Sequence, residues 1–215
     1  METLLQFSEY PKIHNVFSVD MNIKKRVWGR LSSPYFDYLK DCDWIGTEKI
    51  DGMNIRVMYD GEKVIFGGRT DKAIIPGKLQ LRLNELFPLE FFVNSVPMIL
   101  FGEGYGAGIQ AGGCYLPDVQ DFILFDIKMI NRWMTHDEVV QFAESKGLTM
   151  VPEVFNGKLV NAIDLVKEGF LSKIGSKHMA EGMICKPSVP LLDQYGHRII
   201  VKLKTKELRA CVIDA

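Results

Sequence analysis

The sequence has almost no net charge, since 26 lysines and arginines stand against 27 aspartates and glutamates and leave a formal charge of −1 at pH 7. A protein that binds nucleic acid through its overall field carries a large basic excess. Any nucleic-acid surface of this chain must therefore be local. Two basic groups are candidates: Lys173, Lys177 and Lys186, which a solvated face explains at least as well, and Lys202, Lys204, Lys206 and Arg209.

Cysteine is also scarce. The four cysteines, Cys42, Cys114, Cys185 and Cys211, lie far apart and show neither the paired spacing of a metal site nor a disulfide framework. This usage predicts a reducing, intracellular compartment, which we take to be the cytoplasm.

Long apolar runs, repeats and linkers are absent. No run approaches the roughly 18 residues of a membrane helix, and residues 1–7 lack the basic-then-apolar order of a signal peptide. A chain of 215 residues with 47% hydrophobic residues can bury a core of its own. We therefore expect one unprocessed, soluble domain over residues 1–215, with no membrane segment.

The pattern of apolar residues predicts strands and a few helices. Thr47–Phe66 is expected to form a hairpin, because Ile55, Val57 and Tyr59 alternate and Asp60-Gly61 supplies a turn. Helices are predicted at Lys78–Phe87, from leucines at helical spacing, and from Thr135, which begins a capping box, to Gly147. Short apolar runs predict buried strands at Met98–Phe101, Phe122–Met129, Gly182–Lys186 and Arg198–Leu203. Strands outnumber helices without alternating with them, so the fold class is α+β.

Lys49-Ile50-Asp51-Gly52 is the first candidate for chemistry. On a strand, Lys49 and Asp51 share a face, and Gly52 leaves the backbone accessible. A free lysine is unprotonated in roughly one molecule in a thousand at neutral pH, so neighbouring cations or desolvation have to favour the neutral amine. Lys202 and Lys204 also project from one strand face and would repel each other unless an anion such as a nucleotide phosphate lies between them. Taken alone, each of these lysines is better explained as a solvent-exposed strand residue.

Two glutamates next to glycines are further candidates. In Phe101-Gly102-Glu103-Gly104 and in Glu181-Gly182, the carboxylate can approach a ligand hydroxyl or a hydrated metal without crowding. Each of these segments alone is equally consistent with a turn.

In this order and spacing, the motifs resemble the covalent nucleotidyltransferase superfamily of polynucleotide ligases and mRNA capping enzymes, from about residue 47 to the C-terminus. The resemblance implies an α+β domain whose antiparallel sheets, flanked by helices, enclose a nucleotide cleft. It also implies that Lys49 attacks the α-phosphorus of ATP and carries AMP as a lysyl phosphoramidate.

The resemblance assigns a role to each matching position. Glu48 would contact adenine, Glu103 the ribose hydroxyls, and Phe125 would stack on the base. Glu181, with Asp51, would hold a hydrated Mg²⁺ or Mn²⁺. Lys202 and Lys204 would bind the α-phosphate, and Arg69 matches an arginine that contacts phosphate.

Asn54 separates the branches of the superfamily, because DNA ligases and capping enzymes usually carry arginine five residues after the nucleophile and RNA ligases carry asparagine. Trp44–Asn54, Lys202–Leu208 and Tyr10-Pro11-Lys12-Ile13 also look more like the phage and editing RNA ligases, although Asp51 replaces the histidine that several of them have. The expected activity is therefore ATP-dependent sealing of an RNA 5′-phosphate to a 3′-hydroxyl, and the sequence leaves open whether the ends lie in a nicked duplex or in single strands. The alternatives are the catalytic domain of an ATP-dependent DNA ligase, a capping guanylyltransferase, and a non-catalytic nucleotide or nucleic-acid binding module.

Ligases of this superfamily usually append an OB-fold or a C-terminal helical domain, and the sequence ends about a dozen residues after Lys202-Leu203-Lys204. We therefore expect a minimal catalytic module or a piece of a longer protein. Whether a partner protein or a homodimer completes it stays open.

Overall fold

A computed structural model describes residues 7–175 and 177–213. The expectation that residues 1–7 form no signal peptide concerns residues that, except for Phe7, lie outside this range. Within it, the chain divides into two compact units. The first, here called the Glu103 unit, contains the described residues up to Pro11 and Asp51–Val151, and the second, the Lys49 unit, contains Lys12–Ile50 and the described residues from Pro152 onward. The expectation of one domain over residues 1–215 stays a prediction.

The Lys49 unit is built on a five-stranded sheet in the order β1-β11-β10-β4-β9. Neighbouring strands are antiparallel except for the parallel pair β1 and β11. The strands are β1 (His14–Asn15), β4 (Asp43–Glu48), β9 (Glu153–Lys158), β10 (Gly182–Pro187) and β11 (Val201–Lys204), and β2 (Phe17–Asp20) pairs with β3 (Lys25–Leu31) in a separate ribbon. The helices are α1 (Pro34–Tyr38), α4 (Leu159–Glu168) and α5 (Thr205–Arg209).

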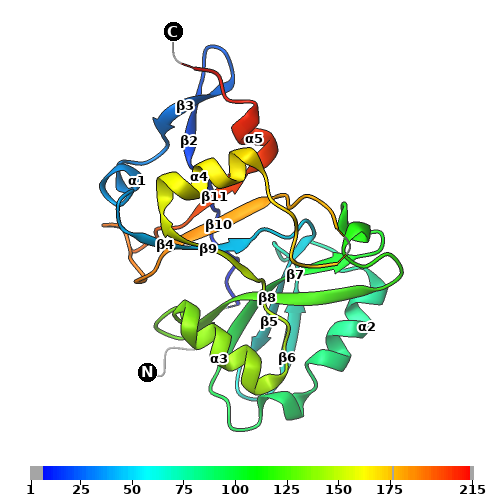
Figure 1. The fold of residues 1–215 in the computed structure, drawn as a ribbon. Coiled ribbons are helices and arrows are strands. Elements are labelled where there is room, and N and C mark those ends of the chain that lie inside the picture. Colours follow the sequence, from blue (N-terminus) through cyan, green and yellow to red (C-terminus); the bar gives the residue numbers. More distant parts are fainter. Residues whose placement is uncertain (1–6, 176, 214–215) are drawn as a thin grey trace. The chain divides into compact units, whose positions relative to one another are not determined.

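Helix α4 covers one face of this sheet (Figure 1). Its buried side chains Leu159, Ala162, Ile163 and Val166 recur at helical spacing and form one apolar stripe. They belong to the same core cluster as Met183 of β10 and Val201 and Leu203 of β11. Because side chains alternate along a strand, the lysines between these apolar positions of β11 lie on the opposite face.

The Glu103 unit is built on a four-stranded antiparallel sheet in the order β6-β5-β7-β8. The strands are β5 (Met53–Tyr59), β6 (Val64–Gly67), β7 (Met98–Gly106) and β8 (Gln120–Met129). The helices are α2 (Gly77–Leu86) and α3 (His136–Lys146), with short 3₁₀ turns η1 (Leu89–Phe92) and η2 (Gly112–Cys114). Side chains of α2 and α3 share a core cluster with Ile55 and Val57 of β5, so both helices pack on one face of the sheet (Figure 1).

Most predicted elements are confirmed, and so is the α+β class with sheets flanked by helices. Helix α2 matches the leucine pattern, and α3 begins with the predicted capping box and ends at Gly147, whose φ of 64° is left-handed. The strands predicted in β7, β8 and β10 are confirmed, with β7 extending to Gly106. The strand predicted from Arg198 begins only at Val201.

The predicted hairpin is correct only from Met53 onward, where β5 pairs with β6. Thr47 and Glu48 belong to β4 in the other sheet, and residues 49–52 form no strand. The argument that Lys49 and Asp51 share a strand face is therefore wrong. The chain passes between two sheets here, and Gly52 allows the passage because a Cβ at this position would lie 2.3 Å from the carbonyl oxygen of Gly104.

Two further sequence observations can be compared with the structure. Within the described part of the chain, no helix combines the length and the apolar character that crossing a membrane requires. All four cysteines are free, with Cys42 and Cys114 exposed, Cys185 buried and Cys211 half-buried. The absence of a disulfide framework is confirmed for these four residues.

Candidate functional site

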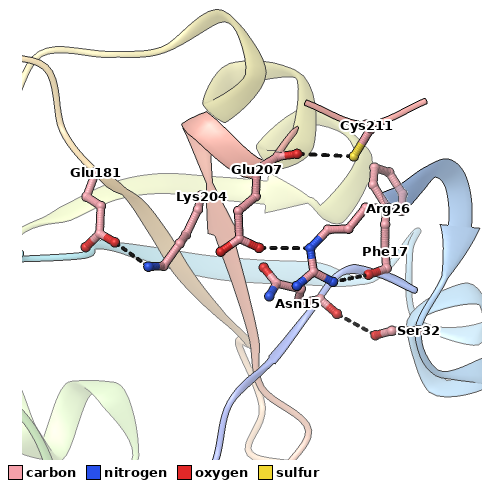
Figure 2. Close-up of polar contacts among 8 residues, drawn as sticks. All are labelled: Asn15, Phe17, Arg26, Ser32, Glu181, Lys204, Glu207 and Cys211. Atoms are coloured by element: carbon pink, nitrogen blue, oxygen red, sulfur yellow. Dashed lines mark hydrogen bonds and ion pairs between the residues drawn. The ribbon is translucent and has the colours of Figure 1, made fainter. Parts of the chain in front are cut away.

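Lys49, Glu181 and Lys204 form a compact charged cluster in the Lys49 unit. Glu181 accepts hydrogen bonds from both lysines, at 2.5 Å from Lys49 Nζ to Oε2 and at 2.6 Å from Lys204 Nζ to Oε1. The side chains of Lys49 and Glu181 are each only 21% exposed, and that of Lys204 is 29% exposed. Figure 2 shows Lys204 reaching Glu181 from β11. A nucleophile predicted from sequence thus lies beside two predicted partners.

The backbone fixes this cluster at the ends of three strands. Lys49 directly follows β4, and its N–H donates to the carbonyl oxygen of Gly182 at 3.0 Å. The carbonyl oxygen of Glu181 accepts from the N–H of Thr205 at 3.1 Å. Gly182 has to be glycine, because a Cβ there would lie 2.0 Å from the carbonyl oxygen of Leu203. The glycine after Glu181 therefore permits close approach of β10 and β11, and Glu181 is not simply a turn residue.

Lys202 lies on the same face of β11 as Lys204 and is half-buried. Burial lowers the pKa of Lys202, and the nearby cations Lys204, Lys49 and Arg26 lower it further against the opposing effect of Glu207. Arg26 Nε donates to Glu207 at 2.8 Å, so this carboxylate is already paired (Figure 2). The shared face predicted for the two lysines of β11 is confirmed.

The electrostatics of the cluster favour an anionic ligand. Burial raises the pKa of Glu181, but the charges of Lys49 and Lys204 outweigh burial and hold this pKa below its usual value. Glu181 is thus an anion that shares its charge between two cations, with Lys202 as a third cation nearby. A phosphate group would supply the negative charge that three half-buried lysines lack.

Glu48 lies on the opposite side of β4 from this cluster, in register with the buried Met183. Its side chain is 1% exposed. The carboxylate accepts hydrogen bonds from Ser172 Oγ at 2.5 Å and from the N–H of Lys173 at 2.8 Å. Both donors come from the segment between α4 and β10, and the sequence offered no signal for either. The predicted contact of Glu48 with adenine stays a prediction.

Asn54 and Glu103 lie directly opposite each other on β5 and β7 in the Glu103 unit. The Oδ1 atom of Asn54 is buried and accepts no hydrogen bond from the described residues. A buried polar atom without a partner is costly in a folded protein and often belongs to a ligand site. These two positions, distant in the sequence, are thus brought together on one sheet face.

Phe125 belongs to an aromatic group on the Glu103 unit. Its ring centroid is 5.1 Å from that of Tyr10, which also packs edge-on against Phe101 and Trp133. Tyr10 Oη donates to the buried Asp126 at 2.6 Å. The Tyr10-Pro11 motif near the N-terminus is thereby tied to the strand that carries Phe125. Stacking of Phe125 on a base stays a prediction.

Asp51 and Arg69 have less defined surroundings. The N–H of Asp51 donates to Tyr115 Oη at 3.2 Å, and Arg69 is exposed in the segment after β6. Tyr115 and Tyr105 are each 4% exposed, so both rings are buried. Across residues 7–175 and 177–213, no group of three histidine, cysteine, aspartate or glutamate side chains is placed to hold a metal ion.

The family model described as RNA ligase matches residues 43–204. This match contains Lys49, Glu181, Lys202 and Lys204, and it covers most of the chain. The chain belongs to the RNA ligase family. No curated protein sequence matches it.

Solved structures of Naegleria gruberi RNA ligase have a similar fold. A lysine-to-methionine mutant with AMP and Mn has a TM-score of 0.68 at 18% identity, over 95% of this chain and 58% of that one. A mutant with ATP and Mn has a TM-score of 0.64 at 17% identity, over 88% and 61%, and the enzyme with PPi has 0.64 at 19%, over 92% and 62%. The chain thus spans about three fifths of the length of these relatives.

Proposed function

We propose that the chain is the nucleotidyltransferase part of an ATP-dependent RNA ligase. The observation that carries the proposal is the cluster in which Glu181 joins Lys49 to Lys204, within a segment that matches the RNA ligase family. The relatives named above were solved with AMP and Mn, ATP and Mn, and PPi, which are the expected nucleotide, metal and product of such a reaction.

In the proposed first step, Lys49 Nζ gives up the proton of its ammonium form and, as the neutral amine, attacks the α-phosphorus of ATP. A phosphorus–nitrogen bond forms, the bond to the pyrophosphate oxygen breaks, and Nζ loses a proton. Lys202 and Lys204, which share one face of β11, would bind the α-phosphate and stabilise the charge that develops there. When phosphate engages Lys204, that lysine exchanges one anionic partner for another, since Glu181 holds it beforehand.

The later steps move AMP and then release it. The lysyl-AMP would be attacked by an RNA 5′-phosphate oxygen, which yields an RNA-adenylate and free Lys49. A 3′-hydroxyl would then attack that 5′-phosphorus and expel AMP. In the Glu103 unit, Glu103, Phe125 and Asn54 are the proposed nucleoside contacts, and Arg69 is a proposed phosphate contact. Asn54 is supported by its buried, unpartnered Oδ1.

The residues of the cluster suit a hydrated divalent metal better than a metal enclosed by protein ligands. A cage of protein ligands does not fit the described residues, and both oxygens of Glu181 already bind lysines. A hydrated ion held by a single carboxylate and by phosphate oxygens needs no such cage. Glu181 would be that carboxylate, and Mg²⁺ or Mn²⁺ would neutralise charge on the ATP phosphates. The role of Asp51 as a further metal ligand stays a prediction.

The first experiment asks whether Lys49 carries AMP. Wild type, Lys49→Ala and Lys40→Ala are stripped of bound AMP, incubated with α-³²P-labelled ATP and Mg²⁺, and denatured. Lys40 is a suitable control because it is an exposed lysine that pairs with Asp37 on α1. Acid-labile label on wild type and Lys40→Ala, but not on Lys49→Ala, supports the proposal. ATP binding without label on any of the three would instead favour a non-catalytic binding module.

The second experiment concerns the substrate. An all-RNA end pair, a nick with ribonucleotides only on the 3′-hydroxyl side, and an all-DNA nick are offered to the adenylylated protein. Asn54 leads us to expect joining of the first two and slow joining of the third. Rapid sealing of the all-DNA nick without joining of RNA ends would favour the DNA ligase alternative, and preferential labelling by GTP would favour a capping enzyme.

A further inference from the structure

Arg56 occupies a place where a charged side chain is rare. It lies in the middle of β5 and is 0% exposed. Along the strand it follows Asn54 on the same face, since Ile55 and Val57 face the core that α2 and α3 cover. A guanidinium removed from water is costly unless its donors are satisfied, so its partners show what the burial achieves.

The partners of Arg56 surround Arg69. Nε donates to the carbonyl oxygen of Gly68 at 2.7 Å, and Nη2 donates to Asp71 Oδ1 at 2.7 Å. Nη1 donates to the carbonyl oxygen of Phe7 at 3.2 Å, and the guanidinium lies 4.2 Å from the centroid of the Phe7 ring. Arg56 thus binds the chain at Gly68, one residue before Arg69, and at Asp71, two residues after it.

The two glycines before Arg69, Gly67 and Gly68, allow the backbone to pack closely against its neighbours. A Cβ at Gly67 would lie 2.9 Å from the Phe7 ring and 3.0 Å from Arg56 Nη2. A Cβ at Gly68 would lie 2.7 Å from the Cβ of Ala73. The backbone that leads into Arg69 therefore packs directly against the buried guanidinium and its neighbours, which leaves this segment little freedom to move.

We infer that Arg56 is a positioning residue that fixes the backbone on both sides of Arg69 and so aims that exposed arginine at a phosphate group. The inference rests on the proposed function, which makes Arg69 a phosphate contact. The two bonds leave the planar guanidinium from different nitrogens in fixed directions, a geometry that the single nitrogen of a lysine ammonium does not reproduce. Asp71, whose side chain is 78% exposed, serves as the outer end of this brace.

A double-mutant cycle tests the inference. Arg56→Lys, Arg69→Ala and the double variant are compared with wild type for the rate of AMP transfer to a 5′-phosphorylated RNA. We expect Arg56→Lys and Arg69→Ala each to slow transfer at least tenfold. In the Arg69→Ala background, Arg56→Lys should cost less than twofold, because the group that it positions is already gone. An equal factor in both backgrounds would show that Arg56 supports the fold only, and overturn the inference.

A milder variant covers the case in which Arg56→Lys fails to fold. Asp71→Ala removes an exposed acceptor and leaves the buried guanidinium with its two carbonyl partners. It should melt near the wild-type temperature and still slow transfer, again only when Arg69 is present. If a folded Asp71→Ala variant transferred AMP at the wild-type rate, the inference that Arg56 and Asp71 position Arg69 would be overturned.

The failure of this inference is separable from that of the proposed function. If wild type forms the Lys49 adduct and the cycle is additive, Arg56 has no positioning role and the ligase proposal stands. If wild type forms no adduct, the proposed function fails. The same cycle is then measured on the affinity for the 5′-phosphorylated RNA, where coupling between Arg56 and Arg69 supports the inference and additivity overturns it.

Discussion

Glu48→Gln keeps the size of a buried side chain and removes its charge. In the native protein both carboxylate oxygens accept hydrogen bonds, one from Ser172 Oγ and one from the N–H of Lys173. An amide presents one oxygen and one NH₂ group, so with its oxygen toward the N–H of Lys173 its NH₂ group would face Ser172 Oγ, which would then have to accept instead of donate. The segment between α4 and β10 would exchange two hydrogen bonds to a charged group for weaker bonds to a neutral one.

The expected cost follows from the burial of this pair. A hydrogen bond to a charged group contributes about 1.5–3 kcal/mol, and Glu48 is 1% exposed, so solvent weakens it little. For a chain of this size, 1 kcal/mol corresponds to roughly 2–4 °C in Tm, which gives a decrease of roughly 3–12 °C. Circular dichroism melts at pH 7 measure this directly.

Ser172→Ala provides the matched control, because it removes the donor and leaves the carboxylate. If both variants act on the same hydrogen bond, the double variant should melt well above the temperature expected from adding the two single decreases. A Glu48→Gln protein that melts within 1 °C of wild type would refute the reasoning. Strict additivity of the two decreases would refute it as well.

Three other substitutions, one of them with a control variant, have definite expected outcomes. Because the pKa of Glu181 is depressed in the folded protein, its stabilisation is present above the unfolded value of about 4.3 and is lost as the pH falls through the folded pKa. The Tm difference between wild type and Glu181→Gln should therefore shrink on acidification, and a difference that grows would contradict this. Gly102→Ala should lower Tm by roughly 2–12 °C through overpacking, because its Cβ would lie 2.2 Å from the Phe122 ring. Gly113→Ala, which meets nothing within 4 Å, should melt like wild type. Lys202→Met should slow adenylylation about 10²-fold in rapid-quench labelling, with arginine restoring part of the rate, and an unchanged rate would remove Lys202 from the proposed chemistry.

The sequence predicted the parts of this structure that depend on local patterns. Alternation gave the β5–β6 hairpin and the shared face of Lys202 and Lys204, and the capping box at Thr135 gave the start of α3. Helix α4 was not predicted, although the spacing of its apolar residues is helical, as it is in α2.

Contacts between distant residues could not be predicted in this way. Nothing in the sequence around Glu48 indicates that its hydrogen-bond partners, Ser172 and Lys173, lie 124 and 125 positions further along the chain. Arg56 follows an alternating pattern in which a polar residue is expected on the exposed face, yet the N-terminal segment and the residues after β6 cover it. The passage at residues 49–52 was read as one continuous strand because alternation does not reveal which sheet a strand joins.

Glu48 and Lys49 are neighbours in the chain but lie in different surroundings. Glu48 is buried in the core, and Lys49 belongs to the charged cluster. A shift of β4 by a single residue against β10 would exchange them, which would bury an ammonium and expose the carboxylate. Misregistered forms of this sheet are therefore strongly disfavoured. A chain that pairs β4 with β10 in this shifted register cannot bury its core without also burying the Lys49 ammonium.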